Sequence, residues 1–181
     1  VHERHDSRLV GVEALVRWQH PERGLLPPGE FIPIAERTGL IADIDAWVMD
    51  QACRQMCQWL ADGAPLSFIA INVSSRLFAR RELYEQVAQV LHATGLDPAF
   101  LELEVTESAV MDDPEVALEQ LHRLRELGLR LAIDDFGTGY SSLLRLKRLP
   151  VQKLKIDQGF VAGLPWDEDD AAIVRVVIAL A

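Results

Sequence analysis

The stretch LRLAIDDFGTGYSS, residues 129–142, decides the fold and marks where the chemistry lies. Its first five residues alternate between large aliphatic side chains and other residues, which is the two-residue period of a β-strand. The strand runs into Asp134 and Asp135, so both carboxylates are predicted at its C-terminal end. A loop with two glycines, Phe136–Tyr140, follows, and the next serine can cap a helix. Adjacent carboxylates repel each other unless a cation or a proton lies between them. The pair therefore indicates either a cation site or two solvated loop acids, and the rest of the chain decides between the two.

Strands and helices alternate along the remaining sequence. Further strands are predicted at Leu9–Trp18, Leu66–Val73, Phe100–Thr106 and Val151–Asp157. Helices are predicted at residues 28–39, 41–61 and 82–94, from 114 to about 128, and from the acidic turn at 167–170 onward, while residues 20–27 are predicted to be a loop. This alternation predicts a parallel α/β fold. We find no internal repeat and no long linker, so we expect one domain over residues 1–181.

Unusual polar residues lie within or at the ends of the predicted strands. They are Glu13, Asn72, Glu104, Asp134, Asp135 and Lys155. A buried carboxylate or ammonium needs a partner, and in a βα barrel the strand ends converge on one rim, where active sites are found. Five strands cannot close an eight-stranded barrel. The sequence therefore predicts either an open sheet or a piece of a barrel.

Composition narrows the classes of function. The chain has 28 acidic and 18 basic residues, and a net charge of −10 disfavours duplex nucleic acid as a partner. A small phosphorylated ligand held through metal ions is compatible with this charge. No apolar run has the length of a membrane span. Cys53 and Cys57 lie four residues apart in a predicted helix, so we expect core thiols in a reducing, cytoplasmic compartment.

Five motifs, in this order, resemble those of EAL domains, which are bacterial signalling phosphodiesterases specific for cyclic di-GMP. The motifs are Glu13–Arg17 (EALVR), Asn72–Ser74 (NVS), Glu104–Glu107 (EVTE), Asp134–Ser142 (DDFGTGYSS) and Lys155–Asp157 (KID). Together they span nearly the whole chain. The resemblance implies a modified TIM barrel of which this chain covers about five strands.

The resemblance also implies an activity, the hydrolysis of cyclic di-GMP to linear pGpG with two Mg²⁺ or Mn²⁺ ions. By motif match, Glu13, Asn72, Glu104 and Asp134 are ligands of one cation, and Asp134 and Asp135 are ligands of the second. Oxygen donors suit these hard cations, and Ca²⁺ is expected to inhibit because it acidifies bound water less.

Other positions match residues of the family that act on the substrate or the loop. Lys155 resembles the lysine that contacts the attacking water, and Glu107 the glutamate that holds the DDFGTGYSS loop. Leu15, Arg17 and Asp157 resemble residues that contact the dinucleotide.

The resemblance extends to the parent protein. It implies a strand with Tyr-Gln-Pro before residue 1 and one with Glu-Gly-Val-Glu after residue 181, together with flanking sensor or cyclase domains. A homodimer and a cytoplasmic domain of a membrane-anchored parent are compatible with it.

Two other functions stay open at this point. One is a degenerate EAL domain that binds cyclic di-GMP, or scaffolds a partner, without cleaving the nucleotide. The other is an unrelated metal-dependent barrel that abstracts a proton next to a carboxylate, since that chemistry also uses strand-end acids and a lysine.

Overall fold

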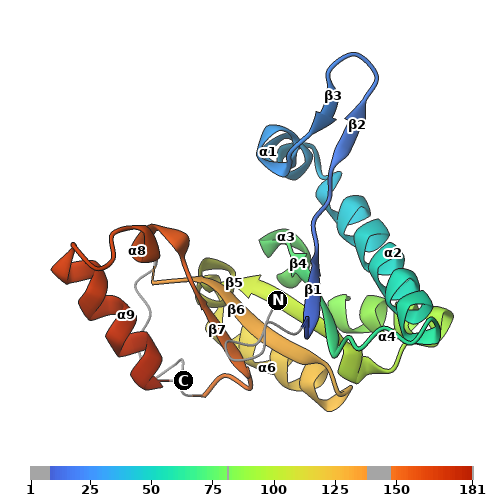
Figure 1. Ribbon diagram of the computed structural model, residues 1–181. Coiled ribbons are helices and arrows are strands. Elements are labelled where there is room, and N and C mark those ends of the chain that lie inside the picture. The colour runs from blue at the N-terminus through green and yellow to red at the C-terminus, as the bar shows by residue number, and fades with distance from the viewer. Residues whose placement is uncertain (1–8, 81, 138–147, 181) are drawn as a thin grey trace.

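The computed structural model describes residues 9–80, 82–137 and 148–180, and its centre is a curled, five-stranded parallel sheet (Figure 1). The strand order is β1-β4-β5-β6-β7, and all four neighbouring pairs are parallel. The strands are β1 (Gly11–Ala14), β4 (Phe68–Val73), β5 (Leu101–Thr106), β6 (Arg130–Phe136) and β7 (Lys153–Ile156). The sheet forms part of a barrel wall, and the parallel α/β fold predicted from the sequence is confirmed.

Helices connect the strands and cover one face of the sheet. The longer helices are α2 (Ile41–Ala61), α4 (Leu83–Thr94), α6 (Pro114–Glu126) and α9 (Glu168–Leu180). Shorter helices are α3 (Ser75–Phe78), α5 (Glu107–Asp112), α8 (Gln158–Ala162) and the 3-10 turn η1 (Pro98–Phe100), none of which was predicted. Within the described ranges, no helix combines the length and apolar character that crossing a bilayer requires.

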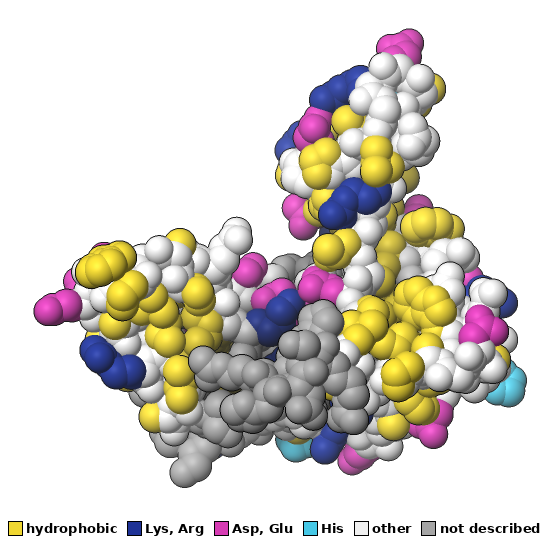
Figure 2. Space-filling model, viewed as in Figure 1, with side chains coloured by type: hydrophobic (Ala, Val, Ile, Leu, Met, Phe, Trp, Pro, Cys, Tyr) yellow, Lys and Arg dark blue, Asp and Glu magenta, His cyan; other side chains and the backbone are white. Residues whose placement is uncertain are grey.

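The alternation of side chains along each strand separates a hydrophobic face from a polar one. On β5, Leu101, Leu103 and Val105 belong to the core that packs against the helices. Glu102 and Glu104 alternate with them and therefore point to the opposite face of the sheet. Acidic and basic side chains lie together near the centre of the molecule in the space-filling view (Figure 2).

The two cysteines lie in or against the hydrophobic core, as predicted. Cys53 is fully buried, and burial raises the pKa of its thiol to about 12. Cys57 is partly buried, and its Sγ donates to the Thr94 carbonyl oxygen at 3.5 Å.

A small lobe projects from the sheet beyond β1 (Figure 1). It contains an antiparallel hairpin of β2 (Trp18–His20) and β3 (Gly24–Leu26), followed by helix α1 (Pro28–Thr38). The prediction of one strand over residues 9–18 is therefore wrong, as is the prediction of a loop at 20–27. The sheet strand stops at Ala14, which pairs with Ile71 of β4.

The acid pair lies at the C-terminal end of its strand, as predicted, and strand β6 continues one residue further, to Phe136. Ile133 pairs with Leu154 and Phe136 with Ile156, so Asp134 and Asp135 lie together opposite the single residue Lys155. This is a β-bulge. The remaining predicted boundaries agree to within two residues, while the helix predicted after Ser142 begins outside the described residues.

Candidate active site

Polar side chains from four strands gather around the ammonium of Lys155, which lies on a fifth. Its Nζ donates to Glu104 Oε2 and, at 2.9 Å, to Asp134 Oδ2. Glu13 Oε2 lies 3.9 Å away. Asn72 Nδ2 donates to Glu13 Oε1 at 2.9 Å and so joins β4 to the same cluster. The structure thus brings together five residues that the sequence places between positions 13 and 155.

Burial and ion pairing act in opposite directions within this cluster. Glu104 is only 3% exposed, and burial raises the pKa of its carboxyl despite the hydrogen bond from Lys155. Burial lowers the pKa of Lys155, but its hydrogen bonds to Glu104 and Asp134 outweigh that effect, and the net pKa is raised. Lys155 is therefore a permanent cation among acids.

The bulge explains how both members of the acid pair avoid the hydrophobic core. Strict alternation would turn Asp135 toward the helices, where an unpaired carboxylate is costly. Asp135 instead has a positive φ of 52° and is exposed. Burial is the largest cause that raises the pKa of its carboxyl, followed by the charges of Asp134 and Asp157. Bulges are common beside active sites, where they re-aim side chains.

Glu107 contacts the start of the loop that follows β6. It is the first residue of α5, is 1% exposed, and its Oε2 accepts the Gly137 N–H at 2.7 Å. Its Oε1 is buried and has no hydrogen-bond partner among the described residues. Gly137 has φ +107°, and a Cβ there would lie 2.8 Å from the Phe160 ring. A glycine is therefore required between Glu107 and Phe160.

The donor set of the cluster suits a divalent cation. In the described part of the chain, no group of three histidine, cysteine or acidic side chains is arranged closely enough to hold a metal ion. The ammonium of Lys155 occupies the space between the acids. The ammonium is nevertheless a stand-in for a cation, since Glu13, Glu104 and Asp134 all approach it. Carboxylate and amide oxygens are the donors that Mg²⁺ and Mn²⁺ prefer, so the chemistry of these residues fits such an ion.

The three predicted substrate residues lie outside this cluster. Leu15 and Arg17 lie on the connection between β1 and β2, where both are exposed, and Arg17 Nη1 donates to the Val16 carbonyl oxygen at 2.8 Å. Asp157 is the N-cap of α8, and its Oδ1 accepts the Gly159 N–H at 2.8 Å.

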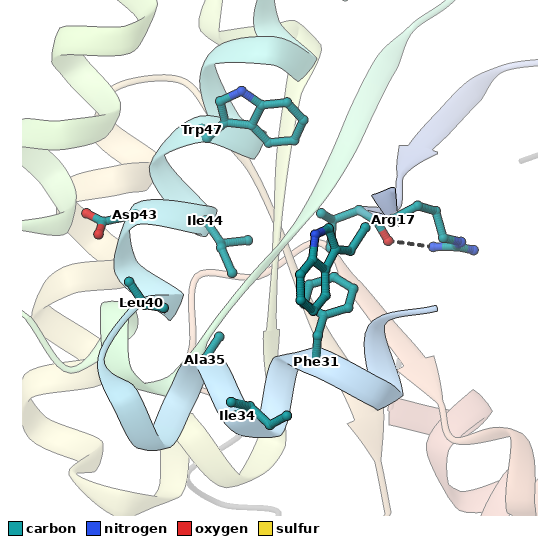
Figure 3. Close-up of a pocket in the computed structure, with 10 residues that line it drawn as sticks. Arg17, Phe31, Ile34, Ala35, Leu40, Asp43, Ile44 and Trp47 are labelled. Atoms are coloured by element: carbon teal, nitrogen blue, oxygen red, sulfur yellow. Dashed lines mark hydrogen bonds between the residues drawn. The ribbon is translucent and has the colours of Figure 1, made fainter. Parts of the chain in front are cut away.

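Arg17 borders an apolar pocket of about 500 Å³ between α1 and the start of α2 (Figure 3). Its apolar lining residues are Val16, Trp18, Phe31, Ile34, Ala35, Leu40, Ile44 and Trp47. The rings of Trp18 and Phe31 meet edge to face, with centroids 5.9 Å apart. The sequence prediction missed this pocket. One signal of the pocket in the sequence is Trp47, a large aromatic residue in helix α2. In the structure Trp47 lies beside the buried residues of α2 and is 57% exposed.

A parallel barrel wall with acids and a lysine on its polar face defines a TIM-barrel-like protein with a candidate metal site. The chain belongs to the EAL domain family, whose model matches residues 1–181. The family and the barrel-like fold inferred from the five motifs are confirmed.

Several relatives have names that state an activity. The chain is 52% identical over 172 residues to the Pseudomonas aeruginosa protein MucR, named a bifunctional diguanylate cyclase/cyclic di-GMP phosphodiesterase, and the match covers 95% of this chain and 25% of MucR. It is 44% identical over 176 residues to the P. aeruginosa cyclic di-GMP phosphodiesterase NbdA, covering 97% of this chain and 22% of NbdA. The chain thus spans about a quarter of the length of these curated relatives.

Solved structures also place the chain among EAL domains. The structure of the PaMucR phosphodiesterase in complex with c-di-GMP superimposes with a TM-score of 0.92 at 52% identity, covering 96% of this chain and 70% of that one. The FimX EAL domain from P. aeruginosa bound to c-di-GMP has a TM-score of 0.79 at 28% identity, covering 92% and 66%.

Proposed function

We propose that this chain is the catalytic domain of a cyclic di-GMP phosphodiesterase that produces linear pGpG with two Mg²⁺ or Mn²⁺ ions. The observation that carries the proposal is the convergence of Glu13, Glu104 and Asp134 on Lys155, in a chain whose EAL relatives include named phosphodiesterases. Flanking sensor or cyclase domains, a homodimer and a cytoplasmic location belong to the same proposal. The name of MucR, which joins a cyclase to a phosphodiesterase, supports the flanking cyclase.

The acids have a specific task in this reaction. A phosphodiester is anionic, and the carboxylates by themselves would repel it. Bound divalent cations supply the positive charge that attracts the phosphate and lower the pKa of water. Glu13, Asn72, Glu104 and Asp134 would hold one ion, and Asp135 would share in holding the second. The bulge at the acid pair supports this division, because it turns both carboxylates away from the core.

Lys155 contributes a positive charge near the attacking water. An ammonium has three N–H donors, and two of them bond to Glu104 and Asp134. We infer that the third holds a water beside the acids. A fixed charge at that point stabilises the negative charge that develops as the water attacks phosphorus.

The pocket beside Arg17 fits one guanine of the dinucleotide. Its volume lies within the usual range for small-molecule sites, and its walls are aromatic and aliphatic. A purine ring can pack against such walls, while the Arg17 guanidinium pairs with a phosphate and Leu15 covers the sugar or base. Asp157, whose charge acts on Asp135, would contact the dinucleotide beside the acid pair.

A second candidate function is binding without cleavage. It is favoured by the position of Lys155, whose ammonium already neutralises acids in the cluster. The test is incubation of the full-length protein with cyclic di-GMP and Mg²⁺ or Mn²⁺, with products separated by chromatography and identified by mass. Formation of pGpG supports the phosphodiesterase, binding without product supports the receptor, and neither binding nor product contradicts both.

A further inference from the structure

A second carboxylate–ammonium pair lies on the same face of the sheet as the candidate active site, two residues closer to the N-terminal ends of the strands. Glu102 precedes Glu104 by two residues on β5, and Lys153 precedes Lys155 by two residues on β7, so each pair faces the same side. Lys153 Nζ donates to Glu102 Oε1 at 2.5 Å. Glu102 is 3% exposed, as deeply buried as Glu104.

Both pairs reach across an intervening strand. β5 and β7 are not neighbours, because β6 lies between them. Ala132 of β6 pairs with Glu104 on one side and with Lys153 on the other, and it is completely buried. Its methyl group leaves room for the long side chains of the neighbouring strands to meet above it. A larger residue at this position would separate them.

Lys155 lies at an irregular point of the ladder between β6 and β7. Ala132 and Ile133 form regular pairs with Lys153 and Leu154, but the bulge begins immediately afterwards, opposite Lys155. A bulge disrupts the local ladder of hydrogen bonds. The regular pairs of β7 that precede Lys155 are those of Lys153 and Leu154. Any shift of Lys153 along or away from β6 moves Lys155 relative to the acids.

Lys153 is anchored by more than one contact. Its Nζ lies 4.4 Å from the centroid of the Phe68 ring, which also faces the guanidinium of Arg130 at 5.3 Å. Arg130 directs its Nε to the Ala99 carbonyl oxygen at 3.0 Å. A deeply buried carboxylate such as Glu102 needs a close cation, and Lys153 supplies it. The ion pair with Glu102 and the contact with the Phe68 ring together fix the N-terminal end of β7.

We propose that Glu102 and Lys153 are positioning residues that hold β7 so that the ammonium of Lys155 enters the acid cluster. They do not touch the substrate. The effect on turnover rests on the proposed phosphodiesterase activity, whereas the effect on the location of Lys155 does not.

A double-mutant cycle in the full-length protein tests the kinetic consequence. We expect Lys153→Met and Glu102→Gln each to lower kcat at least tenfold with less than a twofold change in KM, and Lys153→Arg to retain most activity. With Lys155→Met already present, Lys153→Met should cause no further loss, because there is no ammonium left to position. The matched control is Arg54→Met, which removes a cation from the exposed pair with Asp50 on α2 and should leave kcat unchanged. Equal losses with and without Lys155, or an unchanged kcat, would overturn the proposal.

A second readout does not depend on hydrolysis. Limited acetylation with acetic anhydride, read by mass spectrometry, measures how accessible the Lys155 amine is. We expect its labelling to rise at least threefold in Glu102→Gln, with an unchanged melting temperature showing that the variant is folded. Unchanged labelling in a folded variant would overturn the positioning role. If the wild-type protein cleaves no cyclic di-GMP, the proposed function fails, and the labelling still decides the positioning of Lys155.

Discussion

Replacing Glu107 with alanine is expected to loosen the loop after β6 and weaken metal binding. Glu107 is buried at the start of α5, and one of its carboxylate oxygens accepts the Gly137 N–H. Gly137 follows the bulged acids by two residues, so its position limits where Asp134 and Asp135 can lie. The substitution leaves the Gly137 amide without its acceptor. From the sequence we also expect Glu107 to accept hydrogen bonds from loop amides or from Thr138 and Ser141, and these two residues lie outside the described part of the chain.

The size of the effect follows from one lost bond. A hydrogen bond to a charged group contributes about 1.5 to 3 kcal/mol, and each 1.4 kcal/mol is a factor of about ten in an equilibrium constant. If the whole loss falls on the metal-bound state, the Mg²⁺ concentration for half-maximal activity rises by roughly 10-fold to 150-fold. Because Gly137 can move without unfolding the sheet, the loss of global stability should be far smaller than the loss of activity.

The assay is a Mg²⁺ titration of cyclic di-GMP hydrolysis by the full-length protein with and without Glu107→Ala. Ser108→Ala, a change at the neighbouring exposed residue of α5, is the matched control and should leave the titration unchanged. A metal dependence and a kcat that both equal those of the wild type would show that Glu107 does not anchor the loop. A large drop in melting temperature with an unchanged metal dependence would show that its role is purely structural.

Three further outcomes are expected. Glu13→Ala, Asp134→Asn or Asp135→Asn should each remove nearly all hydrolysis, and retention of more than about a tenth of kcat, a barrier change below about 1.4 kcal/mol, would contradict the role of that residue. Ca²⁺ as the only divalent ion should support no turnover and should compete with Mg²⁺, so full activity in Ca²⁺ would refute the assigned ion chemistry. Burial raises the pKa of the Asp45 carboxyl despite its hydrogen bonds from Ser74. At a pH above this raised pKa the buried carboxylate is charged and lowers the stability of the fold. As the pH falls through the raised pKa, the carboxyl takes up a proton in the folded protein and the destabilisation is lost. Asp45→Asn should therefore match or exceed wild-type stability to urea at pH 7 and lose that advantage in acid, and a large destabilisation at pH 7 would contradict this reasoning.

Much of the fold could be predicted because its signals are local. Helix α2 has the predicted bounds, since its apolar residues recur with the helical period and Gly63 and Pro65 follow it. The meeting of Glu13, Glu104, Asp134 and Lys155 also followed from local signals, because parallel strands place their C-terminal ends on one edge.

Other features could not be predicted because they depend on which residues face each other across strands. The hairpin of β2 and β3 has only three residues in each strand, too few to show a period. The bulge depends on the register between β6 and β7, about which alternation within one strand says nothing. The same limit hid the pairing of Glu102 with Lys153, since both are ordinary polar residues in the sequence.

The open sheet has a practical consequence for work on this domain. Among the described strands, β1 and β7 are the outer strands of the sheet, each with a single neighbouring strand, and the edge of a sheet is where another chain can pair. Apolar side chains of α9, Val176 and Ile178, are also exposed. Residues 1–181 produced in isolation should therefore self-associate into aggregates. Size-exclusion chromatography of this polypeptide at increasing concentration would detect the self-association.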